Sequence, residues 1–404
     1  MKIAIIGAGA AGCFAAANIP FKEGREVVIY EKTGKALQKV KVSGGGRCNV
    51  TNVLEDVLEL STKYPRGGNF VKKTFHHFGT QQTKGWFEKR GVLLKAEDDG
   101  RVFPLSNQSQ SVIDCLDREM IKNRVKIHFH KSVEKIERKE QGFVIYFSDQ
   151  TNTKADNILV TSGGFQREEQ YQWLRDLGHQ IELPVPSLFT FNLKNNPITS
   201  LMGVSVPNAS VKIQGTKILE QGAVLITHWG LSGPAVLRAS AWGARSLKEI
   251  DFCFKININW LGDLRENEMK ESIAKQRQEQ GKQPIFGRNP FQLPKRLWEF
   301  FLEKIGISTT INWGNLSAAH QNKLIELLLR QELEVNGKTT FKEEFVTCGG
   351  VKLSEINHNT MESKLVPGLY FAGEVLDVDG ITGGFNFQHA WASGWLAANA
   401  IQVN

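Results

Sequence analysis

The sequence predicts an α/β fold with a Rossmann-like parallel sheet and helices, followed by a β-rich domain that carries a small helical cap. Three observations support this prediction. The chain opens on a strand, a glycine turn, a helix and a second strand within residues 1–31. Prolines and alternating apolar residues after about Pro184 indicate a change to a β-rich segment. Residues 368–401 again read strand, glycine-rich loop and helix.

The opening stretch has the order of a dinucleotide-binding fingerprint. The sequence G-A-G-A-A-G at 7–12 follows the apolar run Lys2–Ile6 and precedes a small-residue helix and the apolar run Val27–Tyr30. Glu31 closes this second strand, where a carboxylate can accept from both ribose hydroxyls of a dinucleotide. The alternative is an ordinary tight turn between a strand and a helix.

Each glycine of this motif has its own expected role. Gly7 permits the tight turn, Gly9 lets a pyrophosphate approach the backbone, and Gly12 lets the helix pack closely on the sheet. The N–H groups and the partial positive charge of a helix N-terminus then favour a phosphate.

The totals indicate a globular protein of two or three domains. The chain has 404 residues, of which 41% are hydrophobic, and it contains no run of about 18 apolar residues that could span a membrane. The core strand at the N-terminus leaves no room for a signal peptide. Five scattered cysteines without a C-x-x-C argue against disulfides, a zinc site or a dithiol pair. We therefore expect a cytoplasmic protein with no metal and no membrane association.

The net charge of +8 suits an anionic cofactor or substrate. Nucleic acid is not favoured as a partner, because the cations are spread along the chain and no arginine-rich tail or known nucleic-acid module is present. A mildly basic surface is the simpler interpretation.

A second glycine-rich segment, S-G-G-G-R-C-N-V-T-N, occupies 43–52. Three consecutive glycines leave the backbone unshielded, so it can lie against a planar ring or a diphosphate. Arg47 and the preceding Lys39 supply cations, and Asn49, Thr51 and Asn52 supply short hydrogen-bonding groups. A flexible surface loop is the alternative. Cys48 has no resolving cysteine nearby, so a structural thiol is favoured.

The next elements follow from apolar periodicity and turn signals. We expect a helical stretch over 70–90, a hairpin over 93–105, a helix over 109–122 and strands at 125–130, 132–138, 143–147 and 157–160. His76 and His77 would point about 100° apart on a helix, so they make a poor metal pair. The last strand runs into T-S-G-G-F at 161–165, another close approach to a cofactor.

The middle of the chain differs in composition, because prolines and alternating apolar residues follow Pro184. We place a domain boundary near 188, with a first part at 1–188, a β-rich domain at 189–345 and a last part at 346–404. Helices are expected over 235–245, 264–280, 294–304 and 316–331. The last three would form a cap at about 264–333, which either covers substrate or is a plain structural extension.

The closing stretch combines T-C-G-G-V (347–351), a strand at 368–372, a glycine-rich loop at 373–390 and a helix over 391–401. In a flavin protein, such a helix N-terminus faces the pyrimidine edge of the ring. Asp377 and Asp379 match no calcium loop. Asp379 is expected to hold either the ribityl–phosphate region or the loop itself.

These motifs together resemble the FAD-binding flavoproteins known as NAD(P)/FAD-dependent or aminoacetone-oxidase-like oxidoreductases. The resemblance spans the chain, but the match over about 190–345 is only one of layout. It implies a Rossmann-like FAD-binding domain interrupted by the β-rich insert. It also implies that Ala11, Glu31 and Lys32 hold the adenosine half, that Lys39, Arg47 and Asn49 meet the diphosphate and flavin, and that the Val133 backbone meets adenine. Glu374, Asp379, Asn386 and Phe387 would close around the ribityl chain and ring.

The full expected cofactor site consists of glycine-turn residues and their polar neighbours. They are Gly7, Gly9, Ala10, Ala11, Gly12, Glu31, Lys32, Lys39, Ser43, Gly44, Gly45, Gly46, Arg47, Asn49, Thr51, Val133, Ser162, Gly163, Gly373, Glu374, Asp379, Gly384, Asn386 and Phe387.

The expected function is an FAD-dependent oxidoreductase that acts on a small molecule by hydride transfer at flavin N5. No second strand–GxGxxG–helix unit is present, so any NAD(P)H would be a transient electron donor, and an NAD(P)H-linked reductase and an amine-type oxidase are both open. No catalytic acid or base is identified, and structural roles are favoured for the two candidates, His228 and His389. The alternatives are a flavin-dependent RNA-modifying protein and a non-catalytic FAD-binding redox sensor. The substrate, the reaction direction and the oligomeric state are not determined.

Overall fold

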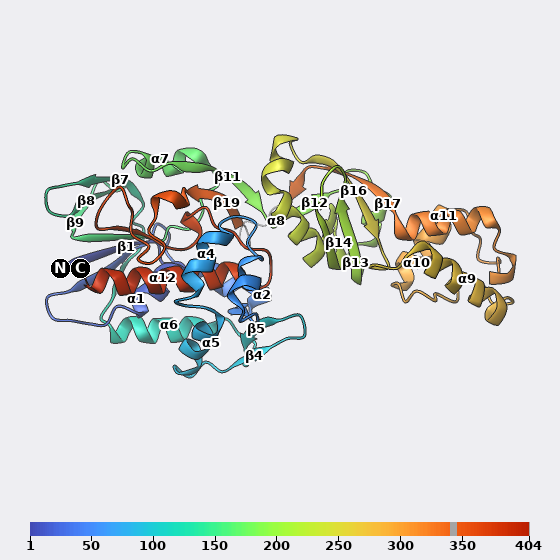
Figure 1. Ribbon diagram of the computed structural model, residues 1–404, viewed down its shortest axis with the longest axis horizontal. Coiled ribbons are helices and arrows are strands. Elements are labelled where there is room, and N and C mark those ends of the chain that lie inside the picture. Colours follow the sequence, from blue (N-terminus) through green and yellow to red (C-terminus); the bar gives the residue numbers. More distant parts are fainter. Residues whose placement is uncertain (340–345, 404) are drawn as a thin grey trace. The chain divides into compact units, whose positions relative to one another are not determined.

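The computed structural model describes residues 1–339 and 346–403 and divides into two compact units (Figure 1). Unit 1 comprises Met1–Ser187 and Phe341–Asn404, and unit 2 comprises Leu188–Thr340. Each unit is described by itself.

Unit 1 is built on a five-stranded parallel sheet in the order β20-β10-β1-β2-β6. Its strands are β1 (Lys2–Ile6), β2 (Glu26–Tyr30), β6 (Lys126–His128), β10 (Asn157–Val160) and β20 (Leu369–Phe371). The three middle strands are almost wholly buried, as expected of a parallel sheet covered on both faces. The predicted Rossmann-like fold class is confirmed.

Helices α1 (Ala10–Ala17) and α12 (Phe385–Val403) lie side by side and bring the two ends of the chain together (Figure 1). Their approach is close at Gly394, where an added Cβ would lie 2.8 Å from the Ala11 carbonyl oxygen. A glycine at this position therefore permits the contact between the two helices. Helix α6 (Gln110–Lys122) also packs on α1.

Smaller elements surround this centre. They are α2 (Gln38–Gly46), β3 (Thr51–Asn52), α3 (Val57–Ser61), α4 (Gly68–Phe75), α5 (Thr80–Glu88), β4 (Leu94–Ala96), β5 (Arg101–Pro104), β7 (Val133–Arg138), β8 (Phe143–Phe147), β9 (Asn152–Ala155), η1 (Glu168–Tyr171), α7 (Gln172–Arg175), η4 (Leu353–Glu355) and η5 (Gly373–Val375). A separate antiparallel pair joins β11 (Ile181–Ser187) to β19 (Val346–Val351).

Unit 2 is a mainly antiparallel seven-stranded sheet in the order β17-β16-β13-β14-β15-β12-β18. Its strands are β12 (Thr190–Asn192), β13 (Ser205–Ile213), β14 (Leu219–Ile226), β15 (Gly230–Ser232), β16 (Cys253–Asn259), β17 (Gln331–Asn336) and β18 (Lys338–Thr339), with η2 at Pro197–Leu201. Helix α8 (Pro234–Glu249) packs on β12, β13 and β14.

The cap of unit 2 consists of α9 (Glu266–Gln280), α10 (Lys295–Lys304), η3 (Trp313–Asn315) and α11 (Ala318–Leu329). It has its own core, in which Trp298 and Trp313 are buried and stack with ring centroids 6.4 Å apart. Gln331 and Leu333 belong to β17 and pair with β16, so the strand begins before the expected end of the cap at 333.

Three elements differ from the sequence-based expectation. The stretch 70–90 is two helices, because the N–H of Gly79 donates to Gln82 Oε1 at 2.9 Å and starts α5 anew. The three glycines end a kinked helix, in which Gly44 and Gly45 adopt left-handed φ values of 58° and 68°. Helix α12 starts at Phe385, six residues earlier than expected, directly after Gly383 and Gly384. Asn386 and Phe387 therefore lie in a helix rather than in a loop.

Over the described residues, no helix is both long enough and apolar enough to cross a lipid bilayer.

Candidate functional site

The first glycine turn is closely packed on its sheet side and open on its outer side. A Cβ added to Gly12 would lie 2.1 Å from the Gly7 carbonyl oxygen and 2.5 Å from Thr161 Oγ1. A Cβ added to Gly9 would meet no atom of the described residues within 4 Å. Gly9 is also the N-cap of α1, and no described side chain caps its N–H groups. The uncapped N–H groups and open side at Gly9 fit a pyrophosphate, so the residues present suit the expected dinucleotide.

Glu31 joins this turn to the end of β2. It is 9% exposed, and its Oε2 accepts the N–H of Ala8 at 2.9 Å. Its Oε1 accepts the N–H and the hydroxyl of Thr33, each at 2.8 Å. A carboxylate has about four lone-pair sites, so this side chain retains capacity for a ribose hydroxyl. The sequence suggested a ribose ligand, and the structure adds a role in fixing the turn.

The segment that follows the three glycines holds the start of α12. Thr51 Oγ1 donates to Gln388 Oε1 at 2.7 Å, and Asn52 Nδ2 donates to the Gly383 carbonyl at 3.0 Å. The Asn49 amide, in the orientation that satisfies its neighbours, accepts the N–H of Gly384 at 2.8 Å. Two motifs more than 330 residues apart therefore form one polar clamp.

The two cations expected at the diphosphate are paired with carboxylates. Lys39 Nζ lies 2.7 Å from Glu374 Oε2. Arg47 Nη1 lies 2.5 Å from Glu97 Oε1, and its guanidinium stacks on the Phe103 ring at 3.9 Å. Both cations are partly exposed, so each pair is worth at most about 1 kcal/mol and leaves the side chains free to rearrange.

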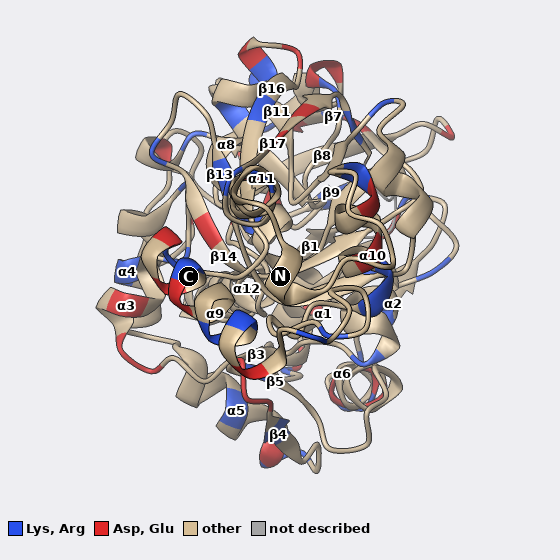
Figure 2. Cartoon of the chain, turned by 90° about the vertical axis from the view of Figure 1, so that its right-hand side faces the viewer, with Lys and Arg blue, Asp and Glu red and all other residues tan. Residues whose placement is uncertain are grey.

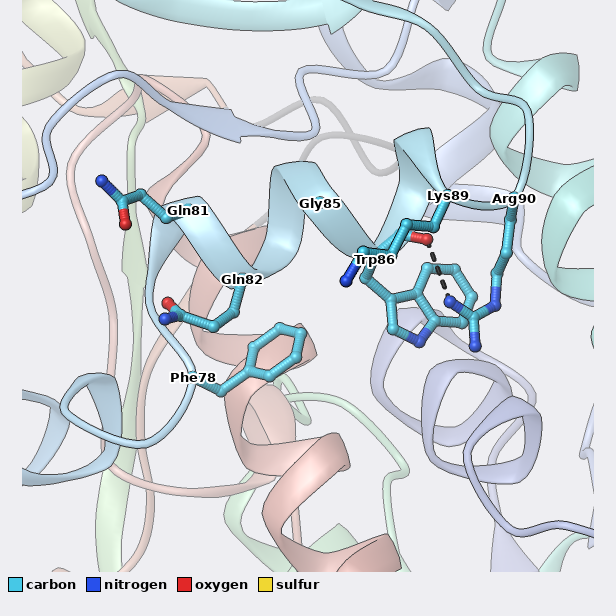
Figure 3. A pocket seen from close by; sticks show the side chains of 7 residues that line it. All are labelled: Phe78, Gln81, Gln82, Gly85, Trp86, Lys89 and Arg90. Carbon is cyan, nitrogen blue, oxygen red and sulfur yellow. Dashed lines mark hydrogen bonds between the residues drawn. The ribbon is translucent and has the colours of Figure 1, made fainter.

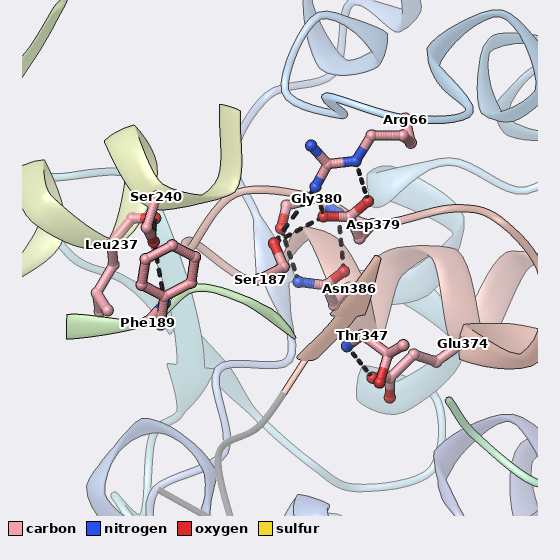
Figure 4. A network of polar contacts seen from close by, with 10 residues as sticks. All are labelled: Arg66, Ser187, Phe189, Leu237, Ser240, Thr347, Glu374, Asp379, Gly380 and Asn386. Carbon is pink, nitrogen blue, oxygen red and sulfur yellow. Dashed lines mark hydrogen bonds and ion pairs between the residues drawn. The ribbon is translucent and has the colours of Figure 1, made fainter. Parts of the chain in front are cut away.

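Glu374 also anchors the glycine-rich segment at 347–351. Its Oε1 accepts the N–H of Thr347 at 2.8 Å (Figure 4). A Cβ on Gly164 would lie 2.5 Å from Thr347 Cβ and 3.1 Å from Glu374 Oε1, so only glycine fits there. The Thr347 hydroxyl is buried and has no hydrogen-bond partner among the described residues. A buried donor left in this way is unusual and fits a polar ligand group nearby.

Asp379 is fully buried and is held by two residues that the sequence did not single out (Figure 4). Its Oδ1 accepts from Arg66 Nε at 2.6 Å, and its Oδ2 accepts from Arg66 Nη2 and, at 2.8 Å, from the Ser187 hydroxyl. Burial raises the pKa of Asp379, and the adjacent Arg66 opposes this shift. Of the two expected roles, these contacts correspond to holding the loop. Arg66 belongs to no motif, so only the tertiary structure reveals it.

The first turns of α12 are likewise tied to the loop. Asn386 accepts the N–H of Gly380 at 2.8 Å and donates to its carbonyl at 2.9 Å. Phe387 stacks on Trp391, with ring centroids 5.6 Å apart and 12° between the planes. His389 is buried, its Nε2 lies 3.3 Å from the Gly373 carbonyl oxygen, and burial lowers its pKa to about 4. This environment is that of a neutral structural histidine.

One buried cluster has the connectivity of a nucleophilic triad. Ser363 Oγ lies 3.0 Å from His179 Nε2, and His179 Nδ1 lies 2.9 Å from Glu355 Oε2. However, Ser363 Oγ also accepts the N–H groups of Leu365 and Val366, and the residue is 5% exposed. The hydroxyl is therefore committed to a turn and closed to substrate, so the cluster is structural.

The remaining expected residues are distributed as follows. Gly7 packs against Thr161, because a Cβ added to Gly7 would meet the Thr161 backbone. Gly373 packs against α1, because a Cβ added to Gly373 would meet the Ala11 side chain. Val133 lies half-buried on β7 opposite Phe147, and Lys32 lies 5.2 Å from the Phe165 ring centroid. His228 is exposed on unit 2. Five glycine-rich segments of unit 1, at 7–12, 43–52, 161–165, 347–351 and 373–384, thus converge, whereas His228 belongs to the other unit.

Two further observations concern metals and thiols. Within 1–339 and 346–403, no group of three or more His, Cys, Asp or Glu side chains could hold a metal ion. Cys48 is buried with its pKa raised to about 12 by burial, which suits the structural thiol expected from the sequence.

Comparison with known proteins identifies relatives over the whole chain. The family model described as HI0933-like protein Rossmann domain matches residues 1–400. A 3-dehydro-bile acid Δ4,6-reductase of Clostridium scindens is 29% identical over 99% of this chain and 98% of its own. The ribosomal RNA dihydrouridine synthases of Haemophilus influenzae and Escherichia coli are each 31% identical over 98% of this chain and 97% of their own.

Among solved structures, a 3-ketosteroid Δ4-(5α)-dehydrogenase of Rhodococcus jostii has a TM-score of 0.50. It is 12% identical and covers 98% of this chain and 97% of its own. At that identity the similarity supports the fold alone.

Proposed function

The chain belongs to the HI0933-like Rossmann family of FAD-dependent oxidoreductases, and we propose that it reduces a carbon–carbon double bond conjugated to a carbonyl group. The names of the relatives support this choice. A Δ4,6-reductase of a 3-dehydro substrate and a synthase of dihydrouridine both add two hydrogens to such a double bond. We therefore base the proposal on the reaction type that these relatives share and not on the substrate of either one.

The proposed reaction is balanced with NAD(P)H as the electron donor. The double bond gains one hydride and one proton, and NAD(P)H is oxidised to NAD(P)+. Bound FAD would supply hydride transfer at its N5 atom. NAD(P)H is proposed as a transient donor, because FAD would occupy the single dinucleotide fingerprint of the sequence.

The chain itself would bind and orient the cofactor. The uncapped N–H groups of α1 and the open side of Gly9 would accept the diphosphate, and Glu31 the adenosine ribose. The N-terminus of α12, fixed by Asn49 and Asn52, would place a partial positive charge beside the flavin. The observation that carries the proposal is the convergence of five glycine-rich segments in unit 1.

An anaerobic absorbance experiment tests the proposal. Purified protein is reduced with NADH or NADPH, and a conjugated enone or a uridine-containing RNA is then added. We expect the flavin absorbance to bleach and then to return as the substrate is reduced. A flavin that stays oxidised with both donors, or stays reduced with both substrates, would contradict the proposal. Repeated cycles would also exclude a non-catalytic redox sensor.

RNA modification is the second candidate, and the charge distribution favours it. Residues 188–340 contain 19 of the 50 Lys and Arg and 13 of the 42 Asp and Glu. Six of the eight net positive charges therefore lie in unit 2. A salt-dependent affinity for RNA would distinguish this candidate from a reductase of small molecules.

A further inference from the structure

Residues 63–67, which connect α3 to α4, hold the loop that precedes α12. The loop comprises residues 377–384, contains three glycines and has neither helical nor strand structure of its own. Glycines leave a backbone many conformations, so contacts from outside must fix the path of this loop. We call residues 63–67 the brace, because they provide such contacts.

Two hydrogen bonds run from the brace to the loop and to the start of α12. The Lys63 carbonyl accepts the N–H of Ile381 at 2.9 Å. The Tyr64 hydroxyl donates to the carbonyl of Phe385, the first residue of α12, at 2.6 Å. Tyr64 is 4% exposed, and burial raises its pKa, so the hydroxyl stays a proton donor. The first residue of α12 is therefore held by a buried, neutral group.

Two further contacts come from the other end of the brace. Arg66 binds Asp379 through its guanidinium (Figure 4), and the two backbones form an isolated bridge. Gly67 lies against Val378, since a Cβ added to Gly67 would be 2.6 Å from Val378 Cγ2. The brace therefore contacts the chain at four places between residues 378 and 385.

The brace itself is anchored in the helices that it connects. The Gly67 carbonyl accepts the N–H groups of Phe70 and Val71, both at 2.9 Å, at the start of α4. The Tyr64 ring packs on Phe75 of α4, with ring centroids 5.5 Å apart. The brace is therefore more constrained than the glycine-rich loop, and it can set the position of that loop.

The body of α12 is held by different residues. The Phe78 ring, which lies beside α5 in Figure 3, stacks on Trp395, with ring centroids 5.2 Å apart. The hydroxyl of Thr83 on α5 donates to Gln388 Oε1 at 2.8 Å. Loss of one brace contact should therefore affect the loop and the first turn of α12 and leave the rest of the helix in place.

We propose that the brace raises the reduction potential of bound FAD by fixing the N-terminus of α12, with Tyr64 as the main positioning residue. A helix N-terminus carries a partial positive charge, and reduction adds negative charge to the flavin. A fixed N-terminus at its expected place beside the flavin therefore favours the reduced form. The inference rests on bound FAD and on that expected place of α12, and not on the reduction of a conjugated double bond.

The test is an anaerobic reductive titration of the FAD-loaded protein with xanthine, xanthine oxidase and a reference dye. It measures the reduction potential of the flavin without substrate or NAD(P)H. Tyr64→Phe keeps the buried ring and removes the hydrogen bond to Phe385. At a fixed ambient potential we expect the ratio of reduced to oxidised flavin to fall about threefold, which corresponds to about 14 mV for a two-electron couple.

Two further variants separate the brace from general loosening of the fold. Tyr64→Phe changes no charge, and the charged positions on the flanking helices, red on α3 and blue on α4 in Figure 2, stay the same. Phe78→Leu is the matched control, because it loosens the packing on the body of α12 and leaves the brace contacts intact. It should lower the thermal midpoint and leave the potential unchanged. Gly67→Ala is a second brace variant, since its methyl group would press on Val378, and it should lower the potential.

The proposal is overturned if Tyr64→Phe keeps the parent potential, or if Phe78→Leu lowers the potential as much. If Tyr64→Phe does not retain FAD, Gly67→Ala takes its place in both criteria. A lowered potential in the brace variants, together with a failed reduction of the enone by the parent protein, would support the brace and contradict the proposed function. The two experiments can therefore fail independently.

Discussion

The carboxylate of Asp379 and the guanidinium of Arg66 form a buried ion pair between segments 313 residues apart. The Arg66 side chain is 10% exposed and that of Asp379 is not exposed at all. Their backbones also form an isolated antiparallel bridge. This pair fixes the glycine-rich loop that precedes α12, and so it sets the position of one side of the expected flavin site.

Breaking this pair is expected to be costly. Asp379→Asn leaves the Arg66 charge buried without its counter-charge, and the free energy of unfolding should fall by about 3–5 kcal/mol. Urea denaturation followed by tryptophan fluorescence measures the change. The double variant Arg66→Met/Asp379→Leu removes both charges and should lose less. An equal or larger loss in the double variant would contradict the assignment of the effect to the unpaired charge.

Gly9→Ala and Gly12→Ala form a matched pair of variants. A methyl group at Gly12 would lie 2.1 Å from the Gly7 carbonyl oxygen, so we expect a lower thermal midpoint together with loss of FAD. A methyl group at Gly9 meets no described atom, so the fold should persist while FAD occupancy falls. The ratio of flavin absorbance to protein absorbance measures occupancy. Full occupancy in Gly9→Ala would show that the diphosphate does not approach this turn.

Glu31→Gln tests the ribose assignment while it preserves most of the turn. The amide oxygen can replace one of the acceptors that hold Ala8 and Thr33. We expect a weaker affinity for FAD by about tenfold, since one charge-assisted hydrogen bond to a ribose hydroxyl is lost. Equilibrium dialysis against FAD measures this change. An unchanged affinity would limit the role of Glu31 to fixing the turn.

The cap of unit 2 can be removed cleanly, because its ends lie together. Arg330 Nη1 is 2.9 Å from Glu266 Oε2, so a short glycine–serine linker can replace residues 267–329. The buried Trp260 ring packs on Phe301 of the cap, with ring centroids 5.8 Å apart, so Trp260→Gln is added to avoid an exposed indole. We expect FAD to remain bound and turnover to be lost. Trp260→Gln alone is the control, and loss of FAD from the deletion variant would contradict this prediction.

His389 gives the pH dependence of stability a defined direction. Its pKa is about 4 in the folded protein, against an ordinary value of 6.5. The unfolded chain therefore binds a proton that the folded protein does not, and stability falls as the pH drops from about 6.5 towards 4. The His389→Gln variant should lose less stability than the parent between about pH 7 and pH 5. Identical slopes in denaturation experiments would contradict this assignment.

The sequence by itself determined the fold class, because the relevant signals are local. The strand–glycine–helix order of residues 1–31 depends on glycines at the turn and on apolar runs of strand length. Both features can be read directly from the sequence. The family membership likewise followed from motifs at the two ends. The division of residues 70–90 at Gly79 was missed, because its cause is a side-chain hydrogen bond from Gln82 rather than a change in periodicity.

Only the tertiary structure decided which side chains are committed to one another. Lys39 and Arg47 were expected at the diphosphate, but in the fold they face Glu374 and Glu97, which are distant in sequence. Arg66 became visible only beside Asp379. Hydrogen bonds and ion pairs require their two atoms to lie within about 3 Å of each other. The separation of two residues along the sequence does not predict such proximity here, because strands from both ends of the chain lie in one sheet.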